Sequence, residues 1–134
     1  MTKTGVDTNV LFRMVVNDDP AQRAKALAFG EKLNTQNLGF VSLIVLVEFN
    51  WSLRSRYGYS KSEVISAMEK LIRARSLTFE SHDAVVRALE RASRSSVDFA
   101  DALIAEHNLE QGCSHTVTFD QTAARAIPSM ELLT

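Results

Sequence analysis

Short apolar runs alternate with longer, helix-like segments along this chain. The short runs, bounded by polar or turn-forming residues, predict strands at residues 3–6, 40–41, 77–80, 115–119 and 130–133. The longer segments between them predict helices at residues 9–16, 21–33, 43–53, 64–72, 81–92, 98–111 and 120–126. Strands separated by helices indicate the α/β class, with a central, mostly parallel sheet flanked by helices.

Local signals indicate where several of these helices begin and end. Ser42 is placed to cap the helix at 43–53. Ser60 and Glu63 match the capping box, in which each side chain accepts a hydrogen bond from the other residue's backbone N–H. Gly112 predicts the end of the helix at 98–111. For the helix at 21–33, the inward residues are predicted to be Ala24, Leu27 and Ala28, with Ala26 and Phe29 as further candidates.

Length and composition indicate a single domain. The chain has 134 residues, of which 46% are hydrophobic, and this is enough for one core over residues 1–134. The net charge of −1 argues against a bulk field that attracts nucleic acid or membranes. Locally, residues 51–75 are predominantly basic and residues 98–134 predominantly acidic. The basic segment fits solvated helix faces and a phosphate-binding surface equally well.

Cysteine content and hydropathy bear on the compartment. Cys113 is the only cysteine, so the chain forms no internal disulfide, which suits a reducing cytosol. The first residues lead into a strand without the apolar segment of a signal peptide, and no apolar stretch is long enough to span a bilayer. We therefore expect a cytoplasmic protein that does not associate with membranes.

Acidic residues stand at the ends of predicted strands or at the starts of predicted helices. They lie beside or inside apolar runs, where carboxylates are rare unless they are paired or bind a metal. In an open α/β sheet, such positions meet beyond the carboxyl ends of the strands. Carboxylates that converge there indicate a hard cation such as Mg²⁺ or Mn²⁺, because its preferred ligands are oxygens. The residues concerned are Asp7, Glu48, Asp98, Asp101 and Asp120.

Each of these positions also has a purely structural interpretation. Asp7 and Asp120 suit a helix N-cap, and Asp98 suits a cap or a first-turn position that the helix dipole favours. Glu48 suits a solvent-facing residue, whereas Asp101 shares a helix face with Asp98 but is followed by apolar residues. Taken singly, the structural interpretation is at least as good as metal binding. Taken together, the corresponding positions favour a metal site.

Four sequence motifs resemble those of PIN-domain nucleases. They are VDTNVL at residues 6–11, VE at 47–48, DALIA at 101–105 and TVTFD at 116–120. Their order and the chain length most resemble the VapC-like toxins of bacterial and archaeal toxin–antitoxin pairs, and the resemblance extends from residue 6 to residue 133. It implies a single PIN domain over residues 1–134, with a three-layer arrangement of sheet and helices.

The resemblance further implies a Mg²⁺- or Mn²⁺-dependent ribonuclease that hydrolyses RNA phosphodiester bonds. Asp7, Glu48, Asp101 and Asp120 match the catalytic acidic quartet. The implied metal ligands are Asp7, Asp101 and Asp120, with Asp98 as an additional carboxylate that either assists or only caps its helix. The residues that match polar positions around the ligands are Thr8, Asn9 and Thr118.

The resemblance also implies protein partners. Toxins of this kind usually dimerise and are inhibited by a small antitoxin that covers the acidic groove, and the helices at 43–53 and 64–72 are candidate contacts.

The first alternative function is that of a PIN nuclease with a housekeeping role in RNA processing. The second is a non-enzymatic, Mg²⁺-binding α/β signalling module. Such a module needs a lysine beyond a late strand, but the only basic residue after the strand at 115–119 is Arg125.

Three aromatic residues between positions 51 and 59 allow two interpretations. Trp51, Tyr57 and Tyr59 suit partly buried packing best, and they also suit stacking on nucleic-acid bases or lining a groove for a partner. The chain has no glycine-rich phosphate loop and no serine-nucleophile motif, which argues against nucleotide-binding and serine-hydrolase functions.

Overall fold

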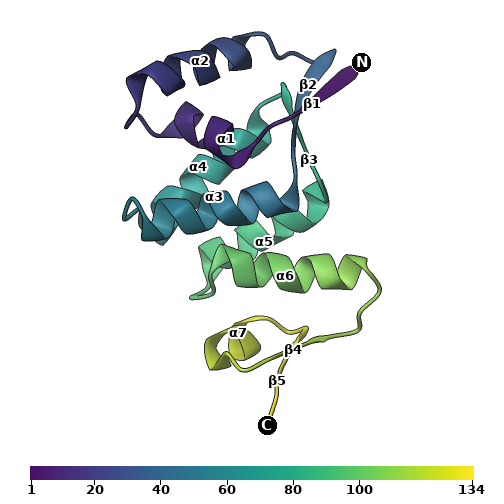
Figure 1. The fold of residues 1–134 in the computed structure, drawn as a ribbon. Helices are drawn as coiled ribbons and strands as arrows, with labels where there is room; N and C mark the ends of the chain where they lie inside the picture. The colour runs from purple at the N-terminus through teal and green to yellow at the C-terminus, as the bar shows by residue number, and fades with distance from the viewer. The chain divides into compact units, whose positions relative to one another are not determined.

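The structure, a computed structural model, describes all 134 residues and alternates helices with strands (Figure 1). The helices are α1 (Thr8–Val15), α2 (Pro20–Glu31), α3 (Leu43–Ser55), α4 (Lys61–Arg73), α5 (His82–Arg94), α6 (Phe99–Glu110) and α7 (Gln121–Ala126). The strands are β1 (Thr2–Gly5), β2 (Asn37–Val41), β3 (Leu77–Phe79), β4 (Thr116–Thr118) and β5 (Met130–Leu132). All the predicted elements are present, so the α/β class is confirmed.

The chain divides into two compact units, Met1–Glu80 and Ser81–Thr134. In the first unit, three strands form a parallel sheet in the order β1-β2-β3. In the second unit, β4 and β5 form a parallel pair. The strands thus form two sheets, and every pairing between strands is parallel, as expected for strands connected through helices.

Strand β2 is longer than the sequence predicts. Residues 34–39 were expected to form a loop, but Asn37 and Leu38 pair with β1. Gly39 lies in the middle of the strand, where an added Cβ would lie 2.9 Å from the methyl groups of both Leu33 and Leu77. The strand therefore requires glycine where an apolar side chain would have revealed it in the sequence.

The core of the first unit is built by helices on one another and on the sheet. Helix α1 packs against α2 and α3, and α3 packs against α4. The rings of Phe12 and Phe49 meet edge to face at a centroid distance of 6.0 Å. The largest fully buried side chains in this unit are Leu11, Val41, Leu46, Phe49, Leu53, Val64 and Met68.

The predicted caps are confirmed. The Ser42 hydroxyl accepts a hydrogen bond from the N–H of Val45 at 3.3 Å. Ser60 and Glu63 form the complete capping box, and its hydrogen bonds hold the pKa of Glu63 below the usual value. Gly112 has a φ of +92° and follows the end of α6. None of the helices combines the length and hydropathy needed to cross a bilayer.

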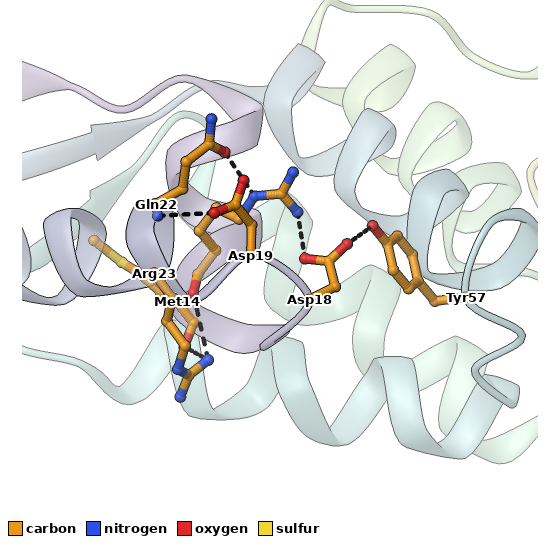
Figure 2. Close-up of polar contacts among 7 residues, drawn as sticks. Met14, Asp18, Asp19, Gln22, Arg23 and Tyr57 are labelled. Atoms are coloured by element: carbon orange, nitrogen blue, oxygen red, sulfur yellow. Dashed lines mark hydrogen bonds and ion pairs between the residues drawn. The ribbon is translucent and has the colours of Figure 1, made fainter.

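The predicted inward face of α2 is wrong. Only Ala26 is buried, whereas Ala24, Leu27 and Ala28 are exposed. Because small and apolar residues occur on several sides of this helix, its spacing does not select one face. Polar contacts attach α2 to the end of α1 instead: the Arg23 guanidinium donates to the carbonyl of Met14 at 3.3 Å (Figure 2).

A polar network joins the loop between α1 and α2 to the residues that follow α3. The Arg13 guanidinium contacts the Asp18 carboxylate at 2.6 Å. The other oxygen of Asp18 accepts a hydrogen bond from the Tyr57 hydroxyl (Figure 2). The bond from Tyr57 lowers the pKa of Asp18. The network therefore fixes Tyr57 within the first unit.

The second unit is built on helices α5 and α6, which pack against each other, and α7 packs against both strands of the unit. Small residues on α5, including Ala84 and Ala88, are fully buried. The Arg87 guanidinium donates to the Glu106 carboxylate at 2.8 Å, which raises the pKa of Arg87. This ion pair holds α5 and α6 together, and α6 carries two of the predicted site residues.

Candidate active site

Asp7 follows β1 and occupies the N-cap position of α1. Its backbone carbonyl accepts from the N–H of Leu11 at 3.1 Å, but its side chain makes no capping hydrogen bond. The residue is exposed, whereas the preceding Val6 is buried. The structural interpretation of Asp7 as a side-chain cap is therefore wrong, and its carboxylate is directed to solvent without a capping role.

Glu48 lies on the exposed side of α3 and is held by a residue of α1. The Thr8 hydroxyl donates a hydrogen bond to the Glu48 carboxylate at 2.8 Å, across a sequence separation of 40 residues. Thr8 directly follows Asp7, so the contact joins the start of α1 to the middle of α3. Asn9, the next polar residue, is exposed in the first turn of α1.

In the second unit, Asp98 and Asp101 lie at the start of α6. The Asp98 carboxylate accepts from the N–H of Ala100 at 3.1 Å, which confirms its role as a helix cap. Asp101 lies in the first helical turn, three residues later, and is half-buried. A capping carboxylate uses one oxygen on the backbone and retains a second oxygen, so capping and metal binding do not exclude each other.

Asp120 directly precedes α7 and is also a cap. One carboxylate oxygen accepts from the N–H of Ala123 at 3.0 Å. Its own backbone N–H donates to the Thr118 hydroxyl at 3.0 Å, so Thr118 fixes the turn between β4 and α7. The position of Asp120 is therefore defined from both sides.

The three carboxylates of the second unit act on one another electrostatically. Burial raises the pKa of Asp101, and the negative charges of Asp120 and then Asp98 raise it further. The ionised form of Asp101 is thus disfavoured by its surroundings in the metal-free protein. A bound cation would reverse this effect, because it would favour the ionised form of Asp101.

The five carboxylates fall into two groups. Asp7 and Glu48 belong to the first unit, and the other three belong to the second. No group of three or more His, Cys, Asp or Glu side chains is already arranged to hold a metal ion. The oxygen-only donor set fits Mg²⁺ or Mn²⁺, and the convergence of the two groups stays a prediction.

Two features were missed by sequence reasoning. The partner of Glu48 was not foreseen, because the hydroxyl of Thr8 lies 40 residues away in the sequence. The exposure of Phe119, at 79%, was also not foreseen, and its position directly before Asp120 was the only sequence signal for it. Trp51, for which the sequence left partly buried packing and base stacking open, is 64% exposed.

The comparison with known families agrees with the motifs. A model of the PIN domain matches residues 6–127, a range that spans both units and contains all five carboxylates. A comparison with curated proteins gave no match. Because the family model covers most of the chain, this protein belongs to the PIN-domain family, whose fold supports nuclease-type hydrolysis.

Proposed function

We propose that this protein is a metal-dependent ribonuclease and the toxin of a toxin–antitoxin pair. Membership of the PIN family supports hydrolysis of nucleic acid. The observation that carries the proposal is the state of Asp101, a half-buried carboxyl group whose pKa is raised by burial and by the charges of Asp120 and Asp98. Mutually repelling carboxylates at the starts of two helices are an arrangement that a cation stabilises.

In this proposal, the residues that would hold Mg²⁺ or Mn²⁺ are Asp7, Asp98, Asp101 and Asp120, in a single PIN domain over residues 1–134. A cation bound by them would supply the activation of a water molecule and the stabilisation of the oxygen that leaves the phosphorus. Glu48 completes the acidic quartet. Oxygen-only ligands select hard cations, and the clustered negative charge otherwise repels the phosphate backbone of RNA.

The chain's own residues position the reacting groups. Thr8 holds the Glu48 carboxylate through its hydroxyl, and Thr118 fixes the backbone of Asp120. The first turn of α1, with Asn9, presents backbone N–H groups that favour an anionic phosphate. These contacts reduce the freedom of the carboxylates before RNA binds, which lowers the entropic cost of reaching the reactive geometry.

The toxin role rests on the likeness of the motifs and of the chain length to VapC-like toxins. We propose that the protein is cytoplasmic, forms a homodimer and is inhibited by an antitoxin that places an arginine against Asp7, Asp101 and Asp120. The planar guanidinium suits this role because it pairs with carboxylates through two hydrogen bonds. A small neighbouring gene that encodes a DNA-binding domain with an amphipathic tail would support the toxin over a housekeeping RNA-processing nuclease.

The experiment is cleavage of an end-labelled, single-stranded RNA by the purified protein. We expect cleavage with Mg²⁺ or Mn²⁺, none with excess chelator, and recovery when the metal is restored. Full activity in chelator would overturn the metal-dependent mechanism. If a cognate antitoxin bound tightly but left cleavage intact, the inhibition by groove blocking would be wrong.

A further inference from the structure

The three aromatic residues that follow Glu48 have different environments. Tyr57 donates its hydroxyl hydrogen to Asp18 (Figure 2). Its ring centroid lies 4.8 Å from that of Phe12. Tyr59 is half-buried and lines a cavity of about 750 Å³ with Met14. Both tyrosine side chains are therefore partly covered by the first unit itself.

Trp51 differs from both tyrosines. Its side chain is 64% exposed, and its ring takes part in no aromatic or cation–π contact. Tryptophan carries the largest apolar surface of any side chain, so its exposure at a fixed position on a regular helix points to a contact outside this unit.

The position of Trp51 relates it to the proposed active site. It lies three residues after Glu48 on α3, so the two side chains share one face of the helix. Glu48 is itself held by Thr8 beside Asp7. Arg54 lies a further three residues along the same exposed face. The face thus presents a carboxylate, an indole and a guanidinium in sequence, over two turns of helix.

We propose that Trp51 is a stacking platform for an unpaired base of the RNA strand as it reaches the carboxylates. This inference rests on the ribonuclease function proposed above. Stacking on an indole requires the face of a base, which a duplex hides, so the substrate class is single-stranded RNA.

A second protein surface is the competing occupant, because Ile44 and Val47 are also exposed on α3. The charged residues beside Trp51 favour RNA over a protein surface as the occupant. Trp51 lies between Glu48 and Arg54, and charged residues are depleted from the centre of protein–protein contacts. In contrast, basic and aromatic residues together are typical of grooves that bind single-stranded nucleic acid. The basic composition of residues 51–75 agrees with RNA.

The chain provides its own probe, because Trp51 is its only tryptophan. We would titrate the Asp101→Asn protein with a single-stranded RNA in Mg²⁺, so that binding is measured with metal present but without cleavage, and follow tryptophan emission. Stacking predicts saturable quenching by single-stranded RNA, little quenching by a duplex of the same length, and a weaker effect at high salt.

Variants then test whether the contact contributes to substrate binding. Stacking is worth about 1–3 kcal/mol per base, so Trp51→Ala should raise KM for a labelled RNA by roughly 5- to 140-fold and leave kcat within about twofold. Trp51→Phe should restore most of the affinity, because it retains a ring. Ile44→Ala is the matched control: it removes a 73% exposed apolar residue from the same helix and should leave KM unchanged.

The outcomes separate this inference from the proposed function. If the protein cleaves RNA with metal but Trp51→Ala has the parent KM, or RNA binds without changing the emission, the stacking role is wrong and the nuclease function stands. If the tryptophan emission depends on protein concentration, and Ile44→Ala changes the emission as much as RNA does, α3 contacts another protein and the inference is overturned. If no RNA is cleaved under any metal condition, the proposed function fails, whatever the emission shows.

Discussion

Replacing Thr8 by valine tests whether the hydroxyl holds the Glu48 carboxylate in its working orientation. Valine has nearly the shape of threonine but no hydroxyl, so the change removes the 2.8 Å hydrogen bond and little else. A hydrogen bond to an ionised partner contributes about 1.5–3 kcal/mol, and a neutral one about 0.5–1.5 kcal/mol. Because Glu48 is exposed and water replaces part of the loss, we expect about 1 kcal/mol.

That energy predicts a fall in kcat/KM of about fivefold for cleavage of a labelled RNA at saturating metal. Initial rates at substrate concentrations below KM give the ratio directly. Thr8→Ser is the matched control, because it retains the hydroxyl and should keep most of the activity. Parent activity in Thr8→Val would refute the orienting role of Thr8.

A double-mutant cycle separates this contact from other effects of the substitution. The free energies of unfolding of Thr8→Val, Glu48→Ala and the double variant, measured with urea, give the coupling between the two side chains. We expect a coupling of about 0.5–1 kcal/mol. Additive effects of the two substitutions would show that the hydrogen bond contributes nothing to stability.

Two further substitutions test the electrostatics of the second unit. Asp101→Asn should stabilise the metal-free protein at neutral pH, because the pKa of Asp101 is raised in the folded state and the parent therefore loses stability as pH rises from the ordinary value of 3.8 through the raised pKa. Urea unfolding in chelator should show a higher free energy of unfolding for the variant at pH 7 but not at pH 3.5. An equal effect at both pH values would refute this reasoning. Arg87→Met should lower the free energy of unfolding by about 1–2 kcal/mol, since the buried Glu106 carboxylate loses its partner. The double variant Arg87→Met with Glu106→Gln should recover part of the lost stability. If Arg87→Met had no effect in thermal unfolding, the ion pair would not stabilise the second unit.

The order of elements could be predicted from the sequence because each signal is local. The capping box at Ser60 and Glu63 involves residues three apart, and the glycine that ends α6 acts within one turn. Both were confirmed. In contrast, β2 begins at Asn37 because this residue and Leu38 pair with β1, and such pairing across the sheet leaves no periodic pattern in a segment that contains Gly39.

The site was predictable to the level of residue types and element ends. The positions of Asp7 and Asp101 beside helix starts follow from local patterns, and the structure places both there. The contact of Thr8 with Glu48 depends on how α1 packs against α3, which no local pattern specifies. For the same reason, the packing of α2 through Ala26 was missed.

The central proposal is that Asp7 and Asp101 are both metal ligands of a metal-dependent ribonuclease. The most direct test is RNA cleavage by Asp7→Asn and Asp101→Asn, each of which removes a ligand charge with little change in volume. The matched controls are Asp19→Asn in the first unit, where asparagine caps a helix as well as aspartate does, and Asp83→Asn in the second, where the side chain is 83% exposed.

We predict that both site variants lose cleavage in Mg²⁺ and Mn²⁺ while their circular dichroism stays that of the parent, and that both controls cleave normally. Near-parent cleavage by either Asp7→Asn or Asp101→Asn would contradict the proposal that both residues are metal ligands of the nuclease.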